Sequence, residues 1–213
     1  MMSHLVIIPL LLPLLTGILL LLLRGSATEL HRLINLAATL GLVAVALLLL
    51  MQTGEGQVEV YRLGNWSAPF GIVLAADRLA AAMVLVTALL ATGVLFHGAR
   101  TGSHFHVLFQ LQLFGLNGAF LTGDLFNLFV FFEVLLIASY GLLLLGGGRD
   151  RTRAGLHYVV LNLVGSTLFL FAVGSLYGVL GTLNMADMAL RLAQLPASDL
   201  GVVRTAGLLL FAV

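Results

Sequence analysis

The 213-residue chain contains no cysteine and no lysine, and only 9% of its residues are charged. The absence of cysteine excludes disulfides, thiolate metal sites and cysteine nucleophiles. A soluble domain usually has about 25% charged residues, so a chain with so few charges cannot cover a water-facing surface. The basic residues are all arginine, the formal net charge is +1, and no basic stripe could hold nucleic acid. These shortages exclude a soluble enzyme, a disordered chain and a nucleic-acid-binding protein.

Long hydrophobic runs make up most of the sequence. Hydrophobic residues account for 61% of the chain, and the mean hydropathy is +1.13. Because about 20 apolar residues cross a bilayer as a helix, we expect six full spans, at 5–23, 33–51, 79–97, 105–122, 125–145 and 156–180. A seventh apolar run begins at Thr205 and is still too short to span at Val213, so we expect the natural protein to continue further. The predicted fold is an all-α, polytopic transmembrane helical bundle with six full helices and the start of a seventh.

The arginines between the spans predict the orientation. Because positively charged connections stay on the cytoplasmic side, we expect the first, third and fifth connections there. These hold six arginines, against four in the second, fourth and sixth: Arg24, Arg32, Arg100, Arg149, Arg151 and Arg153 against Arg62, Arg78, Arg191 and Arg204. The protein is therefore expected to be a multi-pass protein of the cell (inner) membrane with an external N-terminus.

The connection over residues 52–78 is the only long one, and we expect it on the external side. Val58, Val60 and Leu63 precede a Gly-Asn-Trp-Ser-Ala-Pro segment, and residues 71–74 follow it. This arrangement favours a short external β-hairpin at 58–74. An irregular outer loop is an open alternative.

One carboxyl is expected deep in the membrane. Glu133 lies nine residues beyond Asp124, which opens the fifth span. A rise of about 1.5 Å per residue places Glu133 about 13.5 Å deep, and half of a bilayer core is about 15 Å. A lone carboxyl near the midplane favours its neutral form unless a cation restores the charge, and such a group suits a proton relay. The structural alternative is a glutamate that hydrogen-bonds to a neighbouring helix as packing glue.

Other polar residues within the spans are secondary candidates. Asn162 and Ser166 lie at mid-depth in the sixth span, His157 lies near its cytoplasmic end, and Asn117 is expected to hydrogen-bond from the fourth span to the fifth. In the first span, Pro9 and Pro13 would bend the helix unless neighbours satisfy the carbonyl groups left free. Glycines in the sixth span are expected to permit close helix packing. No motif predicts a cofactor or a metal site.

The segment GLNGAFLTGDLFNLFVFFEVLLIASY at 115–140 resembles the fifth-helix region of a family of antiporter-like membrane subunits. Mrp-type multisubunit Na⁺/H⁺ antiporters and respiratory complex I share this family. Complex I members tend towards tryptophan before the glutamate, where this chain has Phe132. The resemblance implies three N-terminal helices over 1–103, with an external loop at 52–78, and the start of an inverted repeat over 104–213. It also implies that Glu133 is the essential fifth-helix glutamate, with a lysine partner in the seventh helix.

Two functions follow from this resemblance. The first is a membrane subunit of a monovalent cation (Na⁺ or another ion)/proton antiporter, with Glu133 as the proton relay and other subunits of the complex as partners in the bilayer. The second is a proton-pumping membrane subunit of an NADH:quinone oxidoreductase or a membrane-bound hydrogenase. Phe132 favours the antiporter. Neither reading gives this chain a cofactor, a metal or a nucleic-acid partner.

Overall fold

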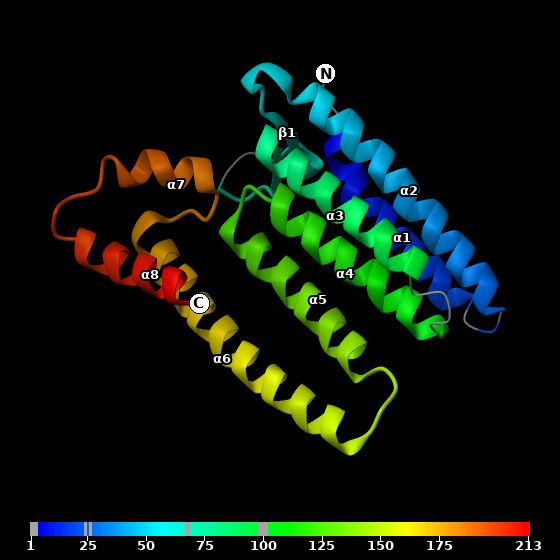
Figure 1. Ribbon diagram of the computed structural model, residues 1–213. Helices are drawn as coiled ribbons and strands as arrows, with labels where there is room; N and C mark the ends of the chain where they lie inside the picture. The colour runs from blue at the N-terminus through cyan, green and yellow to red at the C-terminus, as the bar shows by residue number, and fades with distance from the viewer. Residues whose placement is uncertain (1–3, 24, 26, 67–68, 98–101) are drawn as a thin grey trace.

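The computed structural model describes residues 4–23, 25, 27–66, 69–97 and 102–213, and almost all of its regular structure is helical (Figure 1). A short 3-10 helix, η1, precedes the α-helices. The element bounds are η1 His4–Ile7, α1 Ile8–Leu22, α2 Thr28–Gln52, α3 Arg78–His97, α4 Ser103–Leu121, α5 Leu125–Leu144, α6 Arg149–Leu180, α7 Met185–Leu192 and α8 Leu200–Ala212. All six predicted spans are therefore helices. Arg24 and Arg100, two of the arginines that predict the orientation, lie outside the described residues.

Five stretches are long and apolar enough to cross a membrane: η1 with α1, then α2, α3, α5 and α6. The remaining predicted span, the fourth, is α4, which carries buried polar side chains and lies among α1, α3 and α5. Its His106, Gln110 and Asn117 are at most 3% exposed. A helix surrounded by other helices can hold such residues because protein groups, instead of water, satisfy them. The fold is that of a multi-pass membrane helical bundle.

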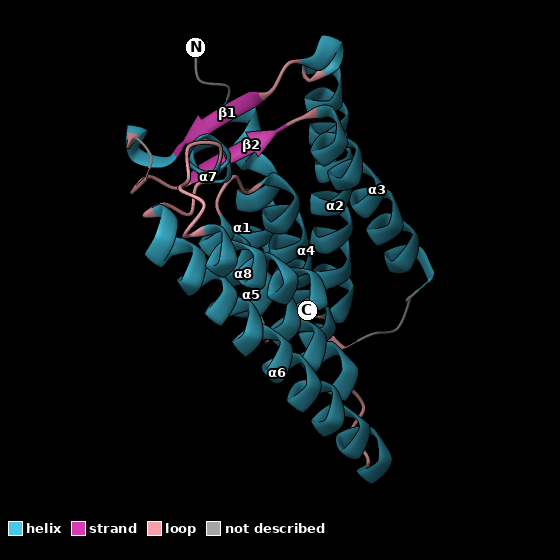
Figure 2. Cartoon of the chain, turned by 90° about the vertical axis from the view of Figure 1, so that its left-hand side faces the viewer, coloured by secondary structure: helices cyan, strands magenta, loops and turns pink. Residues whose placement is uncertain are grey.

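A small sheet covers one end of this bundle (Figure 2). Strand β1 (Glu59–Arg62) pairs antiparallel with β2 (Val73–Ala76), and Glu59 lies opposite Ala76. The predicted hairpin at 58–74 is thus confirmed, with its second strand slightly later in the chain. We call this end of the molecule the hairpin side, and the end with the α5–α6 connection at 145–148 the Arg149 side.

The pairing extends beyond the hairpin to the two connections beside it. Leu74 forms an isolated bridge with Thr122, and Asp124 forms another with Asn184. The Gly123 amide donates to the Val73 carbonyl at 2.9 Å, and the Gly123 carbonyl accepts from the Met185 amide at 2.9 Å. The α4–α5 connection therefore forms backbone hydrogen bonds with strand β2 on one side and with the segment after α6 on the other. These bonds fix the ends of the helices relative to the hairpin.

The packing of α1 against α4 is organised around a missing hydrogen bond. Proline has no amide hydrogen, so Pro13 leaves the carbonyl group of Pro9, one turn earlier in α1, without its helical donor. Asn117 of α4 supplies that donor: its Nδ2 lies 2.9 Å from the Pro9 oxygen. A neighbouring helix thus satisfies the carbonyl group that Pro13 leaves free. The prediction that Asn117 bonds to the fifth span is wrong, because its amide is directed to α1.

Helices α4 and α5 pack tightly against one another at Gly115 and Gly118. A Cβ atom at Gly115 would lie 2.8 Å from Cβ of Leu135, and one at Gly118 would overlap the Phe131 ring. Small residues allow two membrane helices to pack this closely. The sixth-span glycines behave differently from the prediction: Gly155 packs tightly against Leu144, but Gly174 and Gly178 have nothing within 4 Å of a Cβ position in the described structure.

A buried polar cluster joins α2 to α4. Asn35 donates from Nδ2 to Nδ1 of His106 at 2.8 Å and accepts at Oδ1 from Nε2 of Gln110 at 2.6 Å. Because an amide nitrogen can only donate, Nδ1 of His106 is the unprotonated nitrogen of that ring. Nearby, Nε2 of His31 donates to the Leu20 carbonyl at 3.2 Å, in the last turn of α1. These contacts hold the N-terminal helices in register with α4.

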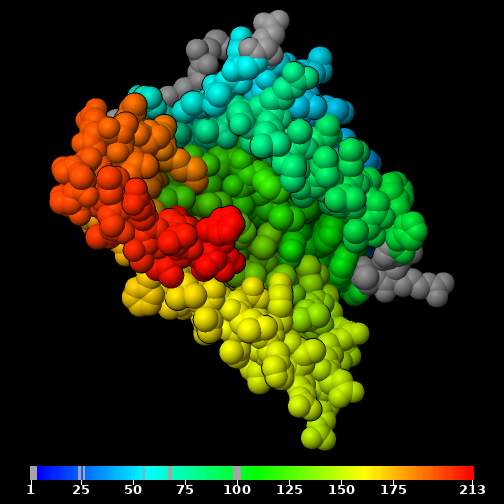
Figure 3. All heavy atoms as spheres, turned by 60° about the vertical axis from the view of Figure 1, so that its left-hand side comes forward, coloured from blue at the N-terminus to red at the C-terminus, as the bar shows by residue number. Residues whose placement is uncertain are grey.

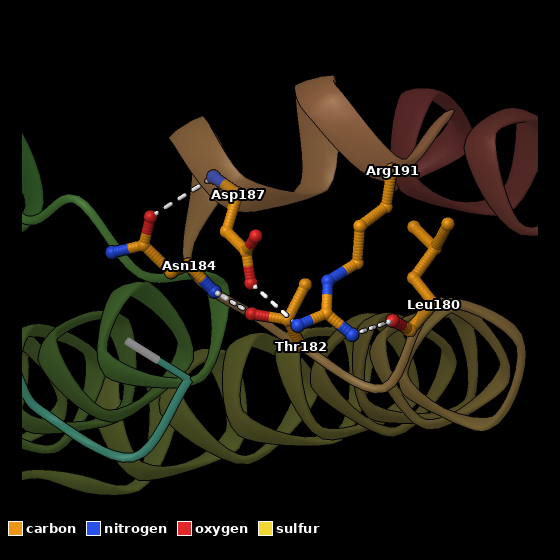
Figure 4. Close-up of polar contacts among 5 residues, drawn as sticks. All are labelled: Leu180, Thr182, Asn184, Asp187 and Arg191. Carbon is orange, nitrogen blue, oxygen red and sulfur yellow. Dashed lines mark hydrogen bonds and ion pairs between the residues drawn. The ribbon is translucent and has the colours of Figure 1, made fainter. Parts of the chain in front are cut away.

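The segment after α6 contains regular structure that the sequence pattern does not predict. A short helix, α7, lies within it, and α8 begins at Leu200 instead of Thr205. Figure 4 shows how α7 is attached: Arg191 donates to the Leu180 carbonyl at 2.9 Å and pairs with Asp187 at 3.0 Å. Hydrogen bonds from Arg191 and Thr182 hold the pKa of Asp187 below its ordinary value. Arg191 thereby closes the end of α6 and fixes α7 to it.

Candidate functional site: a carboxyl-lined cavity

A cavity of about 460 Å³ lies between α5, α6 and α8. Glu133 lines it from α5, and Asn162 and Ser166 line it from α6. Figure 3 shows the side chains of α8 lying over α6, and two residues near its end, Leu210 and Val213, close one side of the cavity. The structure therefore brings together three of the polar residues that the sequence singles out at mid-depth.

Glu133 has an unusual environment within this cavity. It is the ninth of the 20 residues of α5, close to the middle of the helix. Its Oε1 atom is buried and has no hydrogen-bond partner among the described residues. Leaving a buried polar atom unpaired costs about 1–3 kcal/mol, and more if the group is charged. Such an oxygen is suited to bind a proton, a water molecule or a cation.

The walls of the cavity are mainly aromatic and aliphatic. Phe129 of α5 stacks on Phe169 of α6 with ring centroids 6.0 Å apart, and both rings line the cavity. Among the described lining residues none is basic. The Glu133 carboxyl therefore faces an apolar wall to which the described chain brings no cation.

The two polar residues opposite Glu133 present acceptors to the cavity. Asn162 donates from Nδ2 to the Tyr158 carbonyl at 2.8 Å, which leaves Oδ1 able to accept. Ser166 donates its only hydroxyl hydrogen to the Leu163 carbonyl at 3.3 Å, which leaves its lone pairs able to accept. Both residues can therefore receive a hydrogen bond from a protonated carboxyl or from a water molecule beside it.

The remaining secondary candidates lie elsewhere. Asn117 is fully buried between α4 and α1, where it bonds to Pro9. His157 is exposed on the Arg149 side of α6, and its Nδ1 lies 2.8 Å from the Arg153 carbonyl. Neither residue lines the cavity that holds Glu133. Their positions suit a structural role for Asn117 and contact with solvent for His157.

Two features of the site were not predicted from the sequence. The contribution of Leu210 and Val213 could not be foreseen, because an apolar run gives no sign of where it will fold back. Ser139 and Tyr158 were also missed, although they line a second cavity together with Gln112. A serine and a tyrosine in the interior of apolar spans were the signal available for that cavity.

Comparison with known proteins gives the class to which the fold and the cavity belong. Residues 122–213 match the family model described as NADH:quinone oxidoreductase/Mrp antiporter, TM. This match includes α5, α6 and the whole cavity. This part of the chain is therefore similar to a family of antiporter-like membrane subunits.

Within that family, the chain is similar to the D subunits of cation/proton antiporters. It is 51% identical over 203 residues to the D subunit of a probable K(+)/H(+) antiporter of Rhizobium meliloti, covering 91% of this chain and 38% of that protein. It is 42% identical over 219 residues to the D subunit of the Na(+)/H(+) antiporter of Alkalihalophilus pseudofirmus, covering 100% of this chain and 44% of that protein. The chain thus spans about two fifths of the length of these relatives.

Two solved structures contain chains with the same fold. The structure of the membrane-bound sulfane sulfur reductase, an archaeal respiratory membrane complex, matches with a TM-score of 0.89 at 30% identity over 98% of this chain and 43% of that one. The Mrp complex from Dietzia sp. DQ12-45-1b matches with a TM-score of 0.83 at 31% identity over 98% of this chain and 40% of that one. The arrangement of helices around Glu133 is therefore shared by an antiporter complex and a respiratory complex.

Proposed function

We propose that this chain belongs to the D-type membrane subunit of a multisubunit monovalent cation/proton antiporter, and that Glu133 is its proton relay. The observation that carries the proposal is the unpartnered Oε1 of Glu133, buried in a cavity at the middle of a membrane helix. A relay needs a group that can change its charge where water does not screen it. The 51% and 42% identities to antiporter D subunits support this function.

In the proposed mechanism, the protonation of Glu133 and the charge beside it control one another. With no cation nearby, the carboxyl keeps its proton, and Asn162 and Ser166 accept from it or from an intervening water molecule. When a positive group approaches, the carboxylate becomes favourable and the proton leaves. The seventh-helix lysine that the resemblance implies would be this positive group. Cation movement elsewhere in the complex would then be coupled to proton release at Glu133.

The proposal includes an organisation and an orientation. Residues 1–103 form the three N-terminal helices, and residues 104–213 begin the first antiporter-like repeat. The Arg149 side is cytoplasmic, and the hairpin side and the N-terminus are external, in the cell (inner) membrane. Gln57→Cys and Asp150→Cys should therefore react with an impermeant thiol reagent from opposite sides of the membrane. Reaction from the same side, or with the sides reversed, would overturn this orientation.

A second function, that of a proton-pumping subunit in a redox-driven complex, is favoured by the TM-score of 0.89 to a chain of an archaeal respiratory membrane complex. The two functions use Glu133 in the same way and differ in what drives it. The neighbouring genes distinguish them. Small hydrophobic antiporter subunits would support the antiporter, and hydrogenase or dehydrogenase subunits would support the redox enzyme.

The experiment that tests the relay replaces Glu133 by Gln in the natural protein, expressed with the other subunits of its complex. Glutamine keeps the size and the hydrogen-bonding capacity of the side chain but removes the titratable proton. If Glu133 is a relay, cation-induced dequenching of a pH-sensitive dye in inverted vesicles should be abolished while the complex still assembles. If Glu133 only packs helices together, glutamine should substitute well and exchange should stay near normal.

Asp124→Asn is the matched control. Asp124 immediately precedes α5 and caps the helix by accepting from the Phe126 and Asn127 amides at 2.9 and 3.0 Å. Asparagine can cap a helix as well as aspartate does. Exchange in Asp124→Asn should therefore stay close to wild type. Wild-type exchange in Glu133→Gln, at equal membrane levels of the complex, would remove the relay assignment.

A further inference from the structure

A second cavity, of about 490 Å³ and widely open at the surface of the described chain, lies between α4, α5 and α6. Its polar lining residues are Gln112 of α4, Ser139 of α5 and Tyr158 of α6, and Leu142 and Leu143 complete it. Ser139 lies six residues beyond Glu133, a rise of about 9 Å towards the end of α5. Because α5 runs from the hairpin side to the Arg149 side (Figure 1), Ser139 and the second cavity lie nearer the Arg149 side than Glu133 does.

The hydroxyl groups in this cavity have a defined direction of donation. Ser139 Oγ donates to the Leu136 carbonyl at 2.7 Å and lies 3.3 Å from the Tyr158 hydroxyl. Because serine has a single hydroxyl hydrogen, Tyr158 must be the donor in the Ser139–Tyr158 contact. The tyrosine oxygen then keeps its lone pairs to accept from a water molecule. The two hydroxyls form a short chain that ends at the Leu136 carbonyl.

Gln112 gives an independent sign that the cavity holds polar contents. Its Oε1 atom is buried and lacks a hydrogen-bond partner among the described residues. Buried polar groups of this kind are usually satisfied by ordered water. A volume of about 490 Å³ is ample for several water molecules, each of which occupies about 30 Å³ in the liquid.

Two contacts connect the second cavity to the one that contains Glu133. The carbonyl that accepts from Ser139 belongs to Leu136, and Leu136 lines the Glu133 cavity. On the facing helix, Asn162 lines the Glu133 cavity and donates to the Tyr158 carbonyl. About one helical turn of α5 and of α6 therefore separates the two cavities, and polar groups lie on both sides of that turn.

We propose that Gln112, Ser139 and Tyr158 line the water passage through which Glu133 exchanges protons with the Arg149 side of the membrane. This proposal rests on the proposed relay function of Glu133. During transfer, one proton enters from the aqueous side, each water or hydroxyl accepts one and passes one on, and the carboxylate gains one. No group of the passage changes its charge overall. Gln112 and the two hydroxyls hold the water molecules in line without being proton acceptors at the end of the path.

Water access to the second cavity can be measured without any transport. These 213 residues contain no cysteine, so Leu143→Cys places the one thiol of this part of the subunit in the cavity, where Leu143 is 40% exposed; the parent protein without the substitution gives the background labelling. In the assembled complex, an impermeant thiosulfonate should label the Leu143→Cys thiol from the Arg149 side. Ile137→Cys is the matched control, because Ile137 is exposed on the same helix but lines neither cavity. Labelling of Leu143→Cys no faster than that of Ile137→Cys would overturn the passage.

The role of the hydroxyl chain is tested with Tyr158→Phe in the same complex. The variant keeps the ring that packs edge-on against Tyr140, with centroids 5.3 Å apart, and removes only the hydroxyl. The maximal exchange rate should fall about tenfold, the effect of losing one typical hydrogen bond from the transfer path. The cation concentration that gives half-maximal exchange should not change, whereas a general packing defect would change assembly. Tyr177→Phe, on the hairpin side of the same helix, is the control and should exchange normally.

The outcomes separate this inference from the proposed function. Loss of exchange in Glu133→Gln with a normal rate in Tyr158→Phe would overturn the passage and leave the relay intact. Normal exchange in Glu133→Gln would overturn the relay, and the passage with it. Labelling of Leu143→Cys from the Arg149 side, together with a reduced maximal rate in Tyr158→Phe, would support both.

Discussion

Removing the Pro13 ring should make the Asn117 amide dispensable. In the structure, Asn117 donates to the Pro9 carbonyl, which Pro13 cannot serve because it has no amide hydrogen. Asn117→Ala alone should destabilise the protein, since it leaves a buried carbonyl without a donor. Interhelical hydrogen bonds in membranes average about 0.6 kcal/mol and reach about 1.7 kcal/mol, and an orphaned buried acceptor costs about 1–3 kcal/mol. We expect a loss of about 1–2 kcal/mol from the unpaired carbonyl.

Pro13→Ala restores a backbone amide four residues after Pro9, so that α1 can satisfy its own carbonyl. In that background, Asn117→Ala should cost about 1 kcal/mol less than it does in the wild-type protein. The free energy of unfolding is measured by SDS titration in mixed micelles for the wild type, the two single variants and the double variant. These four values form a double-mutant cycle, which gives the coupling energy between positions 13 and 117. The cavity left by alanine cancels in the cycle, because it is present in both backgrounds.

Gln110→Ala is the control for this cycle. Gln110 is also a buried amide of α4, but it donates to Asn35 of α2, whereas the donor to the Pro9 carbonyl is Asn117. Its effect should add to that of Pro13→Ala within about 0.3–0.5 kcal/mol, as for independent sites. If the effects of Pro13→Ala and Asn117→Ala also add within about 0.3–0.5 kcal/mol, the reasoning is refuted. Additivity would mean that the Asn117 side chain does not replace the amide hydrogen that Pro13 lacks.

Three further predictions concern the packing and the cap of the helices. Gly118→Ala should destabilise the protein by about 1–3 kcal/mol in the same titration, since its Cβ would overlap the Phe131 ring, whereas Gly93→Ala meets nothing within 4 Å and should not. Asn35→Leu should cost more than Thr39→Val, because it removes the partner of His106 Nδ1 and the nearer acceptor of Gln110 Nε2, at 2.6 Å, whereas Thr39→Val removes only the farther one, at 3.5 Å; equal losses would contradict the cluster. The lowered pKa of Asp187 means that its contribution to α7 is present above its ordinary value of 3.8 and is lost as the pH falls through the lowered value. Hydrogen exchange of the α7 amides should report that loss in the wild type, and Arg191→Gln should already exchange fast at neutral pH.

The helices were predictable because hydrophobic length is a strong signal in membrane proteins. Six predicted spans are six helices, and α4 is one of them even though its polar residues reduce its hydropathy. The sheet was only half predictable: the residues of the hairpin suggested strands, but its extension to Gly123 and Asn184 joins segments far apart in the sequence. The short helix α7 was missed, because eight residues are too few to cross a membrane and hydrophobic length was the signal used, although Asn184 caps the helix and Asp187 lies in its first turn.

The candidate site was partly predictable for a different reason. Depth along a helix follows from counting residues, so Glu133, Asn162 and Ser166 could be placed at similar depths from the sequence. Their presence in one cavity required in addition that α5 and α6 turn these faces towards each other. The sequence did not show which neighbouring helix the Asn117 side chain would face. It bonds to α1, because Pro13 leaves a free carbonyl acceptor there.

If Glu133 is the relay, its carboxyl must take up and release a proton during exchange. Infrared difference spectroscopy of the complex in membranes, with and without the exchanged cation, measures this through the C=O stretch of a protonated carboxylic acid. We expect a cation-dependent carboxylic acid band in the wild type that is absent in Glu133→Gln and retained in Asp124→Asn. A band that persists unchanged in Glu133→Gln, or an exchanging wild-type complex without any such band, would contradict the relay.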